Sequence, residues 1–213
     1  AGIQSLVLND TTNFALTGGV LRNATQLAVG TYNVKVTATD NNGKQSTSVG
    51  VITVSDTIVP VFTTNVATET KEFAQQSVSQ TIVATDAASV TYSVNDSNFA
   101  INPSSGVLTN ATQLAVGTYN VKVTATDNNG KQATSVGVIT VSDNTDPVFT
   151  QGVLAAQNRE FAQEEVAQTI TATDAAGIQS LVVNDTTNLA LNAGLLTNAT
   201  QLSVGTYNVK VTA

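Results

Sequence analysis

Apolar and polar side chains alternate along much of the chain with a period of two residues. In residues 119–125 every second side chain is apolar, and Lys122 lies among the polar ones. An Asn-Gly pair at 129–130 follows, and residues 135–141 form the expected return strand. Such short alternation predicts strands, and Asn-Gly supplies the positive φ angles of a tight hairpin turn. The side chains expected on the buried face are Val121, Val123, Ile139 and Val141.

The chain repeats itself. The segment Asn-Ala-Thr-Gln-Leu begins at Asn23, Asn110 and Asn198, with spacings of 87 and 88 residues. Two linkers end at Pro60 and Pro147, where proline suits a boundary because it cannot donate to a strand ladder. The predicted domains are a partial repeat at 1–60 without its N-terminal strands, a complete repeat at 61–147, and a partial repeat at 148–213 without its last strand. We expect the chain to be a segment of a longer array.

The complete repeat predicts about seven short strands and no helix. Thr, Val and Ile are abundant, as half-buried pleated surfaces favour, and turn residues separate the strands. About seven strands in fewer than 100 residues indicate an immunoglobulin-like Greek-key β-sandwich. The predicted fold class is therefore all-β, with tandem sandwiches arranged end to end.

Composition narrows the function. The net charge is −7 with eight Lys and Arg residues, so we expect no nucleic-acid partner, since a phosphate-binding face needs clustered positive charge. Cys and His are absent, which removes thiolate nucleophiles and the ordinary proton shuttle. Glu164 and Glu165 are adjacent and would point to opposite faces of a strand, so they do not suggest a catalytic pair. Without these groups we expect the chain not to be an enzyme. No run of 18 apolar residues occurs, so we also expect no membrane insertion.

Acidic residues recur in a fixed order. A Glu is followed 14 residues later by the Asp of an Ala-Thr-Asp motif, at Glu72 and Asp86 and again at Glu160 and Asp174. A later Ala-Thr-Asp ends at Asp127, and the linker at 143–147 reads Asp-Asn-Thr-Asp-Pro before Val-Phe. In order and spacing these motifs resemble the cadherin-like repeat family over nearly the whole chain. The fold expected is thus cadherin-like as well as immunoglobulin-like.

That resemblance implies calcium bound between successive repeats, which stiffens a rod used in adhesion. At the second junction it implies the ligands Glu72, Asp143, Asn144, Asp146 and Asp174. At the first junction it implies Asp56, Asp86 and Asp127. Because Val59 stands where Asp146 stands in the second linker, we expect tighter binding at the second junction. The alternative is that these Asp side chains only cap turns.

The expected function is a structural segment of an extracellular stalk, adhesin or filament at the cell surface. Its expected partners are neighbouring repeats of the same chain and copies of itself in a fibre. The alternative is a carbohydrate-binding cadherin-like module with a glycan or other cell-surface ligand, which would need exposed aromatic side chains or a distinct cation-lined loop. Copying of an Asn- and Thr-rich repeat largely explains the six Asn-x-Ser/Thr sequons. They begin at Asn9, Asn23, Asn95, Asn110, Asn184 and Asn198.

Overall fold

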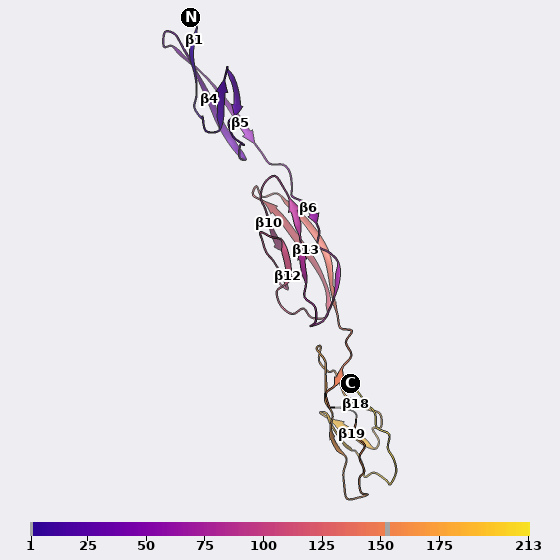
Figure 1. Cartoon of the computed structure of the whole chain (residues 1–213). Helices are drawn as coiled ribbons and strands as arrows, with labels where there is room; N and C mark the ends of the chain where they lie inside the picture. Colours follow the sequence, from indigo (N-terminus) through magenta and orange to yellow (C-terminus); the bar gives the residue numbers. More distant parts are fainter. Residues whose placement is uncertain (1, 152–153) are drawn as a thin grey trace.

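The computed structural model describes residues 2–151 and 154–213, and every regular element among them is a β-strand. Figure 1 shows three groups of strands placed end to end. Each group has a buried apolar cluster of its own. The all-β class with tandem sandwiches is confirmed, while the boundaries at 60 and 147 stay a prediction. Within the described ranges, no helix is long and apolar enough to cross a membrane.

The middle group contains nine strands, which correspond to the seven expected from the sequence because the first and the second expected strand are each interrupted. The elements are β6 (Val61–Thr64), β7 (Glu69–Glu72), β8 (Ser79–Thr81), β9 (Val83–Thr85), β10 (Val90–Val94), β11 (Phe99–Ile101), β12 (Val107–Asn110), β13 (Gly117–Asp127) and β14 (Gln132–Ser142). One sheet has the order β10-β13-β14-β7, in which β7 runs parallel to β14 and the other pairs are antiparallel. The facing sheet has the order β11-β12-β8, and β6 pairs with β9.

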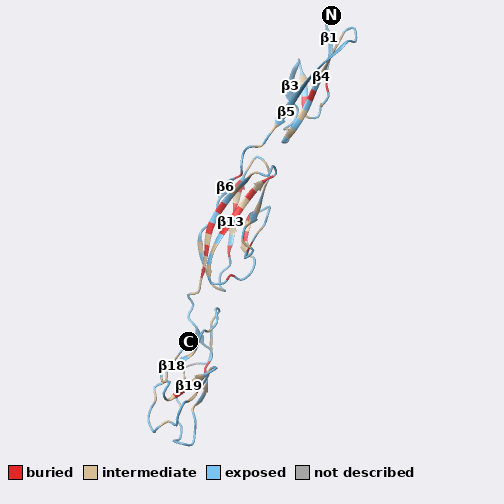
Figure 2. Cartoon of the chain, turned by 180° about the vertical axis from the view of Figure 1, so that it is seen from behind, coloured by how far each residue is buried: buried red, intermediate tan, exposed pale blue. Residues whose placement is uncertain are grey.

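The middle core lies between these two sheets. Ile82 and Leu108 enter it from one side, and the four side chains predicted from the alternation enter it from the other. Val121, Val123 and Ile139 are 0% exposed and Val141 is 3% exposed, which confirms the prediction. Figure 2 shows the buried residues concentrated in this middle group.

The first group has two small sheets, β1-β4-β5 and β2-β3. Its strands are β1 (Ile3–Leu8), β2 (Phe14–Thr17), β3 (Val20–Asn23), β4 (Gly30–Asp40) and β5 (Gln45–Val54). Its buried cluster consists of Leu8, Phe14 and Val34.

The third group has short strands and a buried cluster of Ile170, Val183, Leu189 and Leu196. Its strands are β15 (Val148–Phe149), β16 (Ala167–Thr169), β17 (Ala172–Thr173), β18 (Val182–Val183), β19 (Leu189–Asn192), β20 (Leu195–Asn198) and β21 (Val211–Thr212). They form the sheets β15-β17, β16-β20-β19 and β18-β21.

A repeated asparagine ties the turn after one strand to its neighbour in every group. In the middle group Asn95 Oδ1 accepts from the backbone N–H of Lys122 at 2.7 Å, and Asn95 Nδ2 donates to the carbonyl of Asn120. Asn9 and Asn184 make the equivalent pairs of contacts. These sequon amides therefore serve the fold, because each fills both a donor and an acceptor role of the backbone.

Candidate metal centre

Three carboxylates meet where the first linker reaches the middle group. Asp56 lies in the linker after β5, Asp86 directly follows β9, and Asp127 ends β13. Each offers one oxygen, and the three oxygens lie within 4.8 Å of one another. The structure thus brings together the three residues that the sequence assigns to the first junction.

One oxygen of each carboxylate caps a turn. Asp56 Oδ1 accepts from the N–H of Ile58 at 3.0 Å, and Asp86 Oδ1 accepts from the N–H of Ala88 at 2.9 Å. Asp127 Oδ1 accepts two N–H groups, at 2.7 and 2.9 Å, from the hairpin turn that follows it. The turn-capping role expected as the alternative is therefore real, but it uses only one oxygen of each group.

The other oxygens of Asp86 and Asp127 are buried and have no hydrogen-bond partner among the described residues. The whole Asp127 residue is only 5% exposed. A buried carboxylate oxygen without a donor is costly, and two of them beside a third acid repel one another. A divalent cation would satisfy these oxygens, since Ca²⁺ prefers carboxylate and carbonyl ligands.

Asn129 joins the linker to the middle group at the same place. Its Nδ2 donates to Asp56 Oδ2 at 2.8 Å. This bond, the backbone N–H of Ile58 and the charge of Lys131 hold the pKa of Asp56 below its ordinary value. Sequence reasoning overlooked Asn129 and Lys131, although both lie in the Asn-Gly hairpin turn that follows Asp127.

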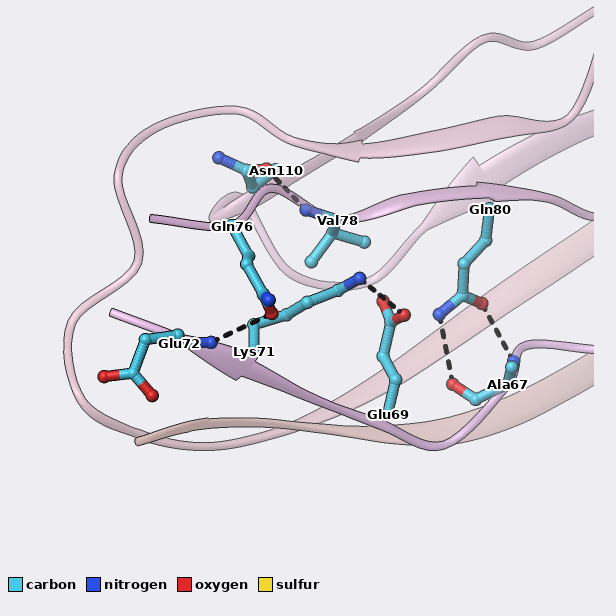
Figure 3. A network of polar contacts seen from close by, with 8 residues as sticks. All are labelled: Ala67, Glu69, Lys71, Glu72, Gln76, Val78, Gln80 and Asn110. Carbon is cyan, nitrogen blue, oxygen red and sulfur yellow. Dashed lines mark hydrogen bonds and ion pairs between the residues drawn. The ribbon is translucent and has the colours of Figure 1, made fainter. Parts of the chain in front are cut away.

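The second junction uses its predicted residues differently. The Glu72 carboxylate accepts from the backbone N–H of Asn144 at 2.7 Å, from Asn144 Nδ2 at 2.9 Å and from the Thr145 hydroxyl at 3.3 Å. Figure 3 shows Glu72 at the end of β7, with its own N–H donating to Gln76 and its carboxylate turned away from that contact. The backbone and side-chain donors of Asn144 lower the pKa of Glu72. Hydrogen bonds therefore fasten this linker to the repeat that precedes it.

The remaining residues of the second set do not join that contact. Asp143 Oδ1 accepts from the N–H of Thr145 at 3.2 Å, and Asp146 is exposed. Asp174 Oδ1 accepts from the N–H of Ala176 at 2.7 Å, and its other oxygen is buried without a partner within the described part of the chain. Of the two predicted sets, the described structure gathers three carboxylates only in the first.

All four tyrosines are half-buried and bond within their own group. The Tyr32, Tyr119 and Tyr207 hydroxyls each donate at 2.9 Å to a carbonyl four residues earlier. The Tyr92 hydroxyl accepts from the N–H of Ala84 at 2.8 Å. The hydroxyl of each tyrosine is therefore engaged within the fold, and each residue is partly covered.

Comparison with known proteins gives few relatives in sequence. No family model matches the chain. An uncharacterized 81.3 kDa protein of Acholeplasma phage L2 is 25% identical over 191 residues, covering 85% of this chain and 23% of that protein. The chain therefore spans about a quarter of the length of the curated relative it matches.

Cadherin extracellular domains are among the solved structures similar to this chain, as the sequence motifs predict. Mouse cadherin-23 EC22-24 is 23% identical, with a TM-score of 0.40, over 97% of this chain and 78% of that chain. A protocadherin gammaB7 EC3-6 cis-dimer structure is 19% identical, with a TM-score of 0.38, over 95% of this chain and 61% of that chain. Neither likeness bears on the residues of the candidate site.

Proposed function

We propose that this chain is a structural segment of an extracellular stalk, adhesin or filament, and that Ca²⁺ stiffens its first junction. One observation carries the proposal: Asp56, Asp86 and Asp127 each offer a carboxylate oxygen, and these three oxygens lie within 4.8 Å of one another. Buried, unpartnered oxygens of Asp86 and Asp127 add to it. The chain acts as a spacer and carries out no catalysis.

A cation bound by these three carboxylates would connect the first linker to the middle group. Asp56 belongs to the linker, whereas Asp86 follows β9 and Asp127 ends β13 in the middle group. An ion that binds all three fixes the direction of the linker relative to that group. Three carboxylates supply part of the six to eight oxygen ligands of Ca²⁺, so carbonyl groups and water supply the rest. Sites of this kind suit an extracellular setting, where weak sites with dissociation constants of about 10⁻⁴–10⁻³ M are filled.

The test compares two aspartates in identical turns. Asp127→Asn keeps the Oδ1 acceptor for the turn and removes the charge. Asp40 occupies the same place in the first group, where its Oδ1 accepts from the N–H groups of Asn42 and Lys44 at 2.8 Å each. Asp40→Asn is therefore the matched control, because Asp40 does not belong to the acidic group at the junction.

Thermal unfolding is followed with chelator and with rising calcium. The native chain should gain stability with calcium, by about 2.7 kcal/mol at 100 times the dissociation constant. Asp127→Asn should lose most of this gain, and Asp40→Asn should keep it. An unfolding temperature of the native chain that is the same in chelator and at a calcium concentration 100 times the dissociation constant, about 10–100 mM, would refute the cation site.

A further inference from the structure

Asn129 connects two of the three acids at the first junction. Its backbone N–H donates to Asp127 Oδ1 at 2.7 Å, and its side-chain Nδ2 donates to Asp56 Oδ2 at 2.8 Å. The second bond spans 73 residues, from the hairpin turn after β13 back to the linker that follows β5. One acid of the junction therefore sets the amide in place, and the amide holds another.

The oxygen that Asn129 holds is the counterpart of the two unsatisfied ones. Asp56 Oδ1 accepts from the N–H of Ile58, so Oδ2 is its remaining oxygen. The remaining oxygens of Asp86 and Asp127 are buried without a partner among the described residues, and Asp127 as a whole is only 5% exposed. Asn129 thus gives a donor to one of the three oxygens that remain after the turns are capped, and it leaves the other two unsatisfied.

An Asn amide can change its role at such a place. It carries a donor and an acceptor on the same carbon, and rotation about its Cβ–Cγ bond exchanges their positions. Asn129 is exposed, so solvent leaves room for this rotation. After rotation an oxygen faces Asp56 Oδ2 in place of the nitrogen, and two oxygens at such a separation repel unless a cation lies between them. The rotated form is therefore favourable only with a bound cation.

We propose that Asn129 is a switchable ligand of the first junction, an inference that rests on the proposed Ca²⁺ site. Without a cation, Nδ2 holds Asp56 by a hydrogen bond. With Ca²⁺, the amide rotates so that Oδ1 becomes a fourth and neutral oxygen ligand beside the three carboxylates. Such a ligand suits the ion, which takes six to eight oxygens and accepts those of Asn side chains. Asn129 then ties the linker to the middle group in both states.

The neutrality of this ligand sets the strength of the site. Calcium affinity depends on the number of charged ligands, so a carboxylate at position 129 would attract the ion more strongly. Without the ion, the same carboxylate would lose the bond to Asp56 and place a fourth negative charge beside it. An amide at this position therefore gives weaker calcium binding and a junction that holds together without calcium.

Asn129→Asp tests both consequences of neutrality. In chelator this variant should unfold at a lower temperature than the native chain, because the bond to Asp56 is replaced by repulsion. In isothermal titration calorimetry it should bind calcium at least about tenfold more tightly. Asn128→Asp is the matched control, because it adds the same charge to the same exposed turn one residue away from the bond to Asp56. The control should keep the native calcium affinity within about twofold.

Asn129→Ala decides between a ligand and a residue that holds the linker only when calcium is absent. Loss of a ligand should weaken calcium binding, by about threefold or more. Loss of a bond made only in the calcium-free state would leave the affinity unchanged or raise it, because only the calcium-free state would be destabilised. The direction of the change in affinity therefore identifies the role.

The side-chain amide protons of Asn129 report the rotation itself. NMR signals from this amide should move during a calcium titration, with the midpoint that calorimetry gives. Asn42 provides the control signal, because its backbone N–H donates to Asp40 Oδ1 in the equivalent turn of the first group. The side-chain signals of Asn42 should stay in place.

The outcomes separate this inference from the cation site. If the native chain binds no calcium at about 10–100 mM, the cation site is refuted and the role of Asn129 as a ligand with it. If the native chain binds calcium but Asn129→Ala binds it at least as tightly, the cation site stands and the role of Asn129 is overturned. Asn129 amide signals that do not move in a chain that binds calcium overturn that role as well.

Discussion

Aspartates in this chain divide into those that use both oxygens locally and those that use one. Asp10 accepts from backbone N–H groups through Oδ1 and from the Asn13 amide through Oδ2, and Asp185 repeats this with Asn188. The amide lowers the pKa of each carboxyl. Within the described part of the chain, Asp86 and Asp127 have no such amide and keep one buried oxygen without a partner. In Asp10 and Asp185 an Asn three residues later therefore occupies the second oxygen, whereas the second oxygens of Asp86 and Asp127 are available to a cation.

Gly50 in β5 and Gly137 in β14 occupy the same position in two identical stretches, residues 47–56 and 134–143. They should respond in opposite ways to the same substitution. Gly137→Ala places a Cβ against Val66, so we expect a loss of about 1–3 kcal/mol in the free energy of unfolding. Gly50→Ala places a Cβ in open space, so unfolding should be unchanged or slightly harder. Urea denaturation of the whole chain measures both. An equal loss for both variants would show that the glycines serve the strand itself and not a close neighbour.

The hydrogen bonds that fasten the second linker should depend on pH. Because Asn144 lowers the pKa of Glu72, the folded chain favours the ionised carboxylate. The stabilisation is present at neutral pH and is lost as pH falls through the lowered pKa, which lies under the ordinary value of a glutamate. The Asn144 amide proton should shift in that range when followed by NMR. Glu72→Gln should abolish the shift, and a shift centred above the ordinary pKa of a glutamate would contradict the assignment.

At the scale of elements, the bridging asparagines explain why the same turn recurs in each group. Asn95 holds the end of β10 to β13 through contacts with Lys122 and Asn120. Asn95→Ala should cost about 1 kcal/mol in the free energy of unfolding, because two partly exposed hydrogen bonds are lost. Asn95→Asp keeps the acceptor for the Lys122 N–H and should cost less. Urea unfolding compares the two, and equal losses would show that the Nδ2 bond alone matters.

The strands could be predicted from the sequence, but the interruptions of the first two could not. The alternation in residues 119–125 predicts both β13 and its buried face. The break between β8 and β9 falls at Ile82, whose N–H donates at 2.9 Å to the carbonyl of Gly106, just before β12. The break between β6 and β7 falls where Val66 donates to Ser135. Both interruptions depend on partners far away in sequence, which no local pattern reveals.

The acidic residues of the first junction were predictable for a different reason. Their order resembles a family pattern, and that resemblance implied the set Asp56, Asp86 and Asp127. Which of their oxygens stay free does not follow, because that depends on the turn each one caps. The bond from Asn129 to Asp56 was also hidden, since the two residues belong to different groups.

At the scale of the whole molecule, the two junctions differ in chemistry. The first combines three carboxylates with a single amide bond across the joint. The second ties Glu72 to Asn144 and Thr145 without a comparable acidic group in the described ranges. Calcium should therefore stiffen the first junction and leave the second junction unchanged.

Small-angle scattering tests this difference. The end-to-end arrangement in Figure 1 should give a radius of gyration well above the roughly 17 Å of a compact globule of this length. Adding calcium to the native chain should increase the longest dimension or narrow its distribution, because carboxylate repulsion at the first joint is replaced by a bound cation. Asp127→Asn should remove that response, whereas Glu72→Gln should leave it intact while loosening the second joint in both conditions. A calcium response that survives Asp127→Asn but disappears with Glu72→Gln would place the cation at the second junction instead.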